Sequence, residues 1–173
     1  MEERPSTTSL ALKWGGITGI ALIVYSTLLY TLGGMANAAL SAIVYVIIIA
    51  GLFLGIREYR TLNGGYLAIG EGVSLGALMT AVSGILSSAY NAIYTTLIDP
   101  GVMEQMQNQA RVKLEEQGNL TDEQIEQSLE IMQKFQSPGM LFIFGVLGSI
   151  LMGALFSLII SAIMRRKKDN PFS

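Results

Sequence analysis

Four long apolar runs limit what this chain can fold into more than any other feature. They cover residues 10–32, 38–56, 66–98 and 140–164, and only Lys13 and Glu71 interrupt them. A helix needs about 20 residues to cross the roughly 30 Å of hydrocarbon in a bilayer. In a soluble fold such helices would need amphipathic partners to cover them, and a chain with 14% charged residues offers none. The runs therefore predict four transmembrane helices.

The basic residues predict which side of the membrane each loop occupies. With a cytoplasmic N-terminus, eight basic residues lie inside and three outside, as the positive-inside rule requires. The inner set is Arg4, Lys13, Arg57, Arg60, Arg165, Arg166, Lys167 and Lys168, and the outer set is Arg111, Lys113 and Lys134. We therefore expect both termini in the cytoplasm.

The segment between the third and fourth runs predicts a water-soluble helical hairpin. Thr121 followed by Gln124 is a capping box that opens the second arm after a break at Gly118-Asn119. Apolar residues recur at helical spacing along both arms, so we expect the arms to pack together and leave a Gln-rich, acidic outer face. These residues are Met103, Met106, Ala110 and Leu114 in the first arm, and Ile125, Leu129 and Met132 in the second.

The predicted fold class is all-α, with four transmembrane helices and an extracytoplasmic helical hairpin between the third and the fourth. Its parts are a cytoplasmic tail at 1–9, helices one to three within 10–98, the hairpin at 99–137, helix four at 138–164 and a basic cytoplasmic tail at 165–173.

Small residues recur at intervals of four in the third and fourth apolar runs. The rows are Gly72, Gly76, Thr80, Gly84, Ser88 and Ala92, and Gly145, Ser149, Gly153, Ser157 and Ser161. Such rows let helix backbones approach closely in lipid, either within one chain, in a dimer or against a partner's helix. A row spaced by four drifts about 40° per step on a helix of 3.6 residues per turn. We therefore expect that no straight neighbour follows a whole row.

Glu71 is the only acidic residue inside the apolar runs, and a carboxylate in a membrane is a candidate functional group. With Arg57 and Arg60 it would form a polar cluster at the cytoplasmic mouth of the bundle. The alternative is a basic interfacial loop in which water or Arg60 satisfies the carboxylate.

The sequence offers nothing that points to an enzyme. It contains no Cys and no His, which removes disulfides, the usual zinc sites and imidazole proton relays. No paired carboxylates, phosphate-binding glycine loop or activated nucleophile is recognisable. We predict no catalytic residue, no cofactor site and no metal site.

Three stretches and a basic C-terminal tail resemble a known family. The stretches read K-W-G-G at 13–16, Y-R-T-L-N-G-G-Y-L-A-I-G-E-G at 59–72 and N-A-I-Y-T-T-L-I-D-P at 91–100. Together they resemble domain of unknown function 4199, a family of small four-helix membrane proteins of Bacteroidota. The matching positions are Arg60, Gly65, Gly70, Asp99 and Pro100, while Leu67-Ala68-Ile69 departs from the family's Ser/Thr-Phe. The resemblance covers nearly the whole chain and implies a bacterial inner membrane, but no activity.

Three classes of function remain, in decreasing order of support. The first is a structural or accessory protein that binds a partner through the hairpin or the small-residue rows. The second is a small oligomeric transporter or channel with a polar path near Glu71 that includes Asn91 and the Ser/Thr residues of helices three and four. The third is a membrane enzyme. Expected partners are membrane lipid and either a membrane protein, a periplasmic protein or a second copy of the chain. No nucleic-acid partner is expected.

Overall fold

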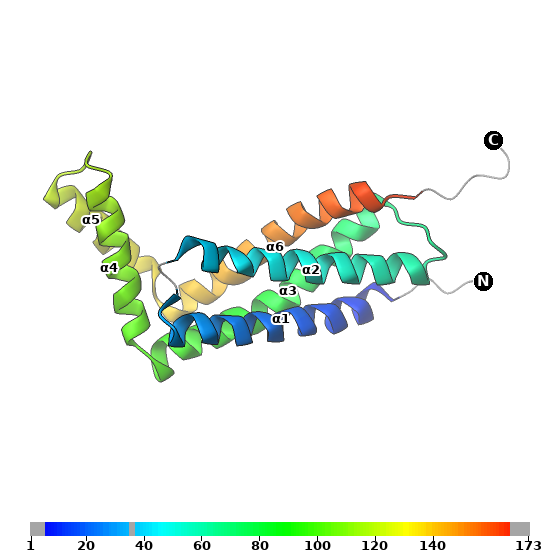
Figure 1. Ribbon diagram of the computed structural model, residues 1–173, viewed down its shortest axis with the longest axis horizontal. Helices are drawn as coiled ribbons and strands as arrows, with labels where there is room; N and C mark the ends of the chain where they lie inside the picture. Colours follow the sequence, from blue (N-terminus) through cyan, green and yellow to red (C-terminus); the bar gives the residue numbers. More distant parts are fainter. Residues whose placement is uncertain (1–5, 35–36, 167–173) are drawn as a thin grey trace.

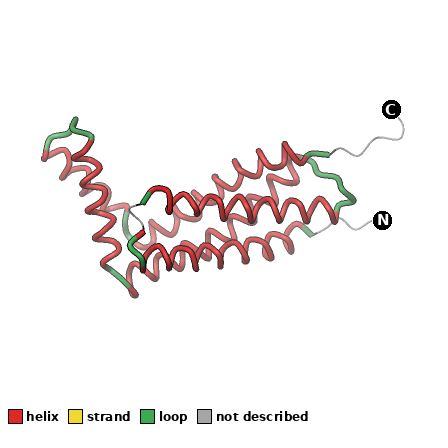
Figure 2. The backbone as a smooth tube through the Cα atoms, in the orientation of Figure 1, coloured by secondary structure: helices red, strands yellow, loops and turns green. Residues whose placement is uncertain are grey.

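The computed structural model describes residues 6–34 and 37–166, and in these ranges every regular element is helical (Figures 1 and 2). Arg4, Lys167 and Lys168, and with them most of both predicted tails, lie outside the described residues. The elements are α1 (Thr7–Thr31), α2 (Ala38–Leu62), α3 (Ile69–Ile93), the π-helical turn η2 (Tyr94–Ile98), α4 (Gly101–Glu116), α5 (Asp122–Phe135) and α6 (Pro138–Met164). The all-α prediction is confirmed for these residues.

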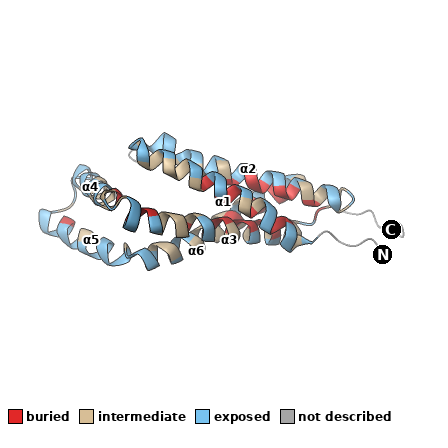
Figure 3. Ribbon diagram, turned by 90° about the horizontal axis from the view of Figure 1, so that it is seen from below, coloured by how far each residue is buried: buried red, intermediate tan, exposed pale blue. Residues whose placement is uncertain are grey.

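Four helices are long and apolar enough to cross a membrane: α1, α2, α3 with η2, and α6. They lie side by side, and the first turn of α1 and the last turn of α6 lie at one end of the bundle, called here the N/C end (Figure 1). Their large apolar side chains point outward, as Leu151 at 67% exposure and Ile163 at 80% illustrate. Buried residues form a narrow stripe between the helices (Figure 3). This arrangement suits a bundle surrounded by lipid.

Small residues from α3 and α6 face each other along the centre of the bundle. At each of five levels a glycine on one helix meets a serine or threonine on the other, so closely that an added methyl group would overlap the hydroxyl side chain. The Ser149 hydroxyl also donates across to the Thr80 carbonyl at 3.0 Å. The five pairs, called here the α3–α6 seam, are Gly72–Ser161, Gly76–Ser157, Thr80–Gly153, Gly84–Ser149 and Ser88–Gly145.

The seam shows how α6 can follow most of the row on α3, although no straight neighbour was expected to follow a whole row. From Gly72 to Ser88 the row stays against α6, and Gly76 also lies against Leu52 of α2. A spacing of four exceeds the 3.6 residues of a helical turn, so both rows drift around their helices with the same hand. Helices that wrap around each other right-handedly keep two such rows in contact.

Glycines also set how the other long helices meet α3. A methyl group on Gly15 of α1 would lie 2.6 Å from the Met79 carbonyl oxygen, and one on Gly19 would lie 3.2 Å from the Cα of Ser83. Gly51 of α2 lies against Thr18 of α1. Helix α3 is therefore packed by α1 on one side and by α6 on another.

The α4–α5 pair lies beyond the end of the bundle opposite the N/C end (Figure 1). Its predicted capping box is confirmed, because the Thr121 N–H donates to Gln124 Oε1 at 2.9 Å and the Gln124 N–H to Thr121 Oγ1 at 3.4 Å. Polar contacts join the two helices, including Arg111 Nη2 to Glu126 Oε1 at 3.2 Å. Of the described residues in α4 and α5, only Val102 and Ile125 are fully buried.

The seam leads to a prediction about matched glycine substitutions in thermal unfolding. Gly76→Val places its side chain into Ser157, whereas Gly148 of α6 has open space where a Cβ would lie. Overpacking typically costs about 1–3 kcal/mol, so we expect Gly76→Val to lower the unfolding midpoint in mild detergent. The unfolding midpoint of Gly148→Val should be close to that of the wild-type chain. Equal midpoints for the two variants would contradict the seam.

Candidate functional site

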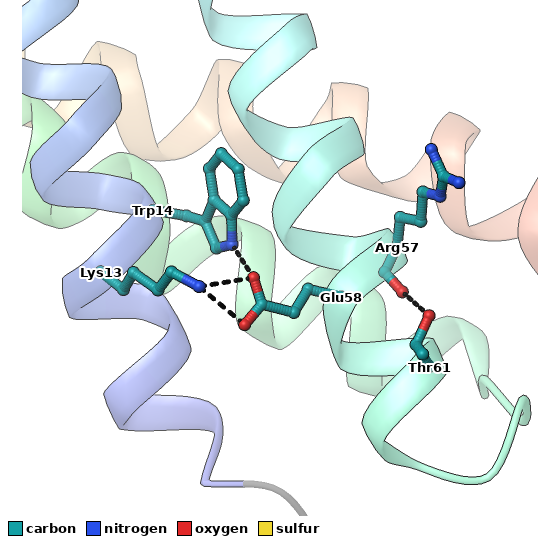
Figure 4. A network of polar contacts seen from close by, with 5 residues as sticks. All are labelled: Lys13, Trp14, Arg57, Glu58 and Thr61. Carbon is teal, nitrogen blue, oxygen red and sulfur yellow. Dashed lines mark hydrogen bonds and ion pairs between the residues drawn. The ribbon is translucent and has the colours of Figure 1, made fainter.

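Glu58 joins α1 to α2 at the N/C end (Figure 4). Lys13 Nζ lies 2.8 Å from both carboxylate oxygens of Glu58, and the Trp14 indole N–H donates to Glu58 Oε2 at 2.7 Å. A carboxylate that accepts three charge-assisted or indole contacts is held in one position. Sequence reasoning missed this network, because its residues lie on two helices and are 44 and 45 positions apart in the chain.

The residues of the predicted cluster, Arg57, Arg60 and Glu71, all lie near the N/C end of the bundle. Glu71 reaches back to accept from the Ala68 N–H at 3.0 Å, which satisfies the first turn of α3. Arg60 Nε donates to the Gly65 carbonyl at 3.0 Å, within the α2–α3 loop. Among the described residues no ion pair joins Glu71 to either arginine. The structure thus gives Glu71 a local capping contact.

A basic groove opens between α2 and α6 at the same end. Its volume is about 620 Å³, and Arg57 and Arg60 line it together with the apolar side chains of Phe53, Ile163 and Met164. The groove combines cationic groups with an apolar wall, which is a chemistry suited to amphipathic anions.

Tyrosines tie α1 to the end of α3 on the side of the α4–α5 pair. The rings of Tyr30 and Tyr94 stack with centroids 4.6 Å apart. The Tyr30 hydroxyl donates to Asn91 Oδ1 at 3.0 Å, and the Tyr90 and Thr27 hydroxyls lie 2.6 Å apart. This cluster adjoins η2, and π-helical turns are frequent at functional sites.

A smaller cavity of about 250 Å³ lies beside the tyrosines. Four of its lining residues are polar: Ser26, Ser41, Ser87 and Asn91. Glu71 lies at the opposite end of α3, and between them Thr80 and Ser83 are each only 2% exposed. Glu71 and Asn91, two of the residues named for a polar path, therefore lie at opposite ends of α3.

The structure offers little that could hold a metal ion. Across residues 6–34 and 37–166 no group of three or more acidic residues is close enough to act as ligands.

Four apolar helices with large side chains outside and glycine and serine inside define a multi-pass helical membrane protein. The chain belongs to the family described as protein of unknown function (DUF4199), which matches residues 13–166. The resemblance inferred from the sequence motifs is confirmed. No curated protein and no solved structure matches the chain.

The Glu58 network makes a prediction for tryptophan fluorescence, because Trp14 is the only tryptophan. Indole excitation moves electron density away from the pyrrole ring, so a carboxylate at the ring nitrogen stabilises the excited state. Removing it with Glu58→Ala should shift the Trp14 emission to shorter wavelength and lower the unfolding midpoint. Glu71→Ala should leave the emission unchanged. An unchanged spectrum in Glu58→Ala would contradict the indole contact.

Proposed function

We propose that this chain is an accessory protein of the bacterial inner membrane that binds another protein through its α4–α5 pair. In this arrangement both termini are cytoplasmic and the α4–α5 pair is a helical hairpin in the periplasm. The partner is a periplasmic protein or the extracytoplasmic part of a membrane protein.

The distribution of charge supports this orientation. Arg57, Arg60, Arg165 and Arg166 all lie near the N/C end of the described bundle, close to the ends of α2 and α6. The α4–α5 pair carries more acidic than basic residues. Basic residues next to membrane spans favour the cytoplasmic side, so the N/C end is assigned to the cytoplasm.

One observation carries the partner-binding role: α5 exposes apolar side chains at the end of the molecule assigned to water. Ile131 is 57% exposed, Phe135 49% and Met132 37%. Residues four apart lie on one side of a helix, so Ile131 and Phe135 form an α5 apolar face, and Met132 lies at its edge. Clustered apolar exposure in water is unfavourable and is typical of interaction surfaces.

The light packing between α4 and α5 is consistent with this surface. Few of their residues are buried, and hydrogen bonds such as Gln107 Nε2 to Gln136 Oε1 at 3.1 Å supply part of the contact. Because so few residues are buried between α4 and α5, apolar side chains of these helices remain exposed and can contact another protein. Truncating a central apolar residue of such an interface typically weakens binding substantially.

We predict that Ile131→Ser separates the chain from its partner. The experiment is purification of the tagged full-length chain from native membranes in mild detergent, with quantitative mass spectrometry. We expect one stoichiometric protein whose recovery falls about tenfold or more in Ile131→Ser, in line with a loss of roughly 1.4 kcal/mol. Gln127→Ser changes an exposed position one turn earlier on α5 and should still co-purify with the partner.

Two outcomes would overturn the proposal. One is a chain that purifies alone or only with further copies of itself. The other is a partner retained equally by Ile131→Ser and Gln127→Ser, because binding would then involve another surface.

A further inference from the structure

Two guanidinium groups face the groove between α2 and α6 without a carboxylate to neutralise them. Arg57 and Arg60 take part in none of the ion pairs formed by the described residues. The nearest acidic residue in sequence, Glu58, is held by Lys13 and Trp14, and Arg57 extends away from it (Figure 4). The groove therefore presents uncompensated positive charge.

The α2–α3 loop holds the groove in shape. Leu67 and Arg166 exchange two backbone hydrogen bonds, at 3.1 and 3.2 Å, which tie the loop to the end of α6. Leu67 is 1% exposed, so the loop is also anchored in the core. The Arg60 Nε contact with the Gly65 carbonyl fixes the side chain of Arg60 against the same loop while leaving its terminal nitrogens to other acceptors.

The wall of the groove is apolar. Phe53 lies one helical turn before Arg57 on α2, and both line the groove. Opposite them, Ile163 of α6 is 80% exposed and Phe53 itself is 42% exposed. The cationic groups thus lie toward the end of the bundle, and the apolar groups continue into the surface that faces lipid.

We propose that this groove binds an anionic phospholipid, with its phosphate on Arg57 and Arg60 and an acyl chain along Phe53 and Ile163. Guanidinium groups bind phosphate through paired, charge-assisted hydrogen bonds. A soluble phosphate would leave the apolar wall exposed, whereas a lipid covers it. The site lies at the end opposite the α5 apolar face, so it stands or fails independently of the proposed protein partner.

Native mass spectrometry of the delipidated full-length chain tests the site. The probes are phosphatidylglycerol and phosphatidylcholine with identical acyl chains. We expect one phosphatidylglycerol to bind about tenfold more tightly than phosphatidylcholine, and the double variant Arg57→Gln/Arg60→Gln to abolish this preference. The matched double variant Arg111→Gln/Lys113→Gln removes the same charge from α4 and should retain it.

A lysine variant and an unfolding measurement separate the effect of hydrogen-bond geometry from those of charge and folding. Arg57→Lys/Arg60→Lys should keep part of the preference, because the charge remains and the paired hydrogen bonds are lost. A thermal-unfolding midpoint equal to that of the wild-type chain verifies that the Gln variant is folded. Three results would overturn the proposal: equal affinity for both lipids, the same loss in the α4 control, or full displacement of the lipid by equimolar glycerol phosphate.

Discussion

The contacts of glycine with serine and threonine between α3 and α6 hold the centre of this bundle. Lipid tails are as apolar as leucine, so apolar side chains gain little by leaving lipid for the bundle interior. Association depends instead on close backbone approach and on hydrogen bonds such as that from Ser149 to Thr80. Glycine makes the approach possible at each of the five levels. Helix α1 then packs on α3 through Gly15 and Gly19, so most of the bundle is arranged around one helix.

This central packing determines what each end of the molecule presents. At the N/C end, α2 and α6 lie far enough apart near their ends to leave the arginine-lined groove, while Glu58 closes the side toward α1. At the other end, stacked tyrosines fix α1 against η2, and the α4–α5 pair follows directly after it. The two proposed binding surfaces, the α2–α6 groove and the α5 apolar face, therefore lie at opposite ends of a tightly packed bundle.

Some features followed from the sequence because they depend on local chemistry. The four candidate transmembrane helices were predicted from the length of the apolar runs. The start of α5 was predicted from the capping box of Thr121 and Gln124. The partner of Glu58 could not be deduced, because it depends on how α1 and α2 are rotated about their axes. The capping contact of Glu71 could have been predicted, because a glutamate at the third position of a helix commonly caps that helix. Its place in an apolar run favoured a functional polar cluster instead.

Disulfide cross-linking across the α3–α6 seam tests its register most directly, because the chain has no cysteine. A Cβ at Gly145 would lie 3.1 Å from that of Ser88, near the roughly 3.5–4.5 Å of a disulfide. In oxidised membrane vesicles, Ser88→Cys with Gly145→Cys should cross-link within one chain. Ser88→Cys with Ser157→Cys, offset by about 18 Å along α6, should not. Equal cross-linking of both pairs, or cross-links only between chains, would contradict the seam and the bundle arranged around it.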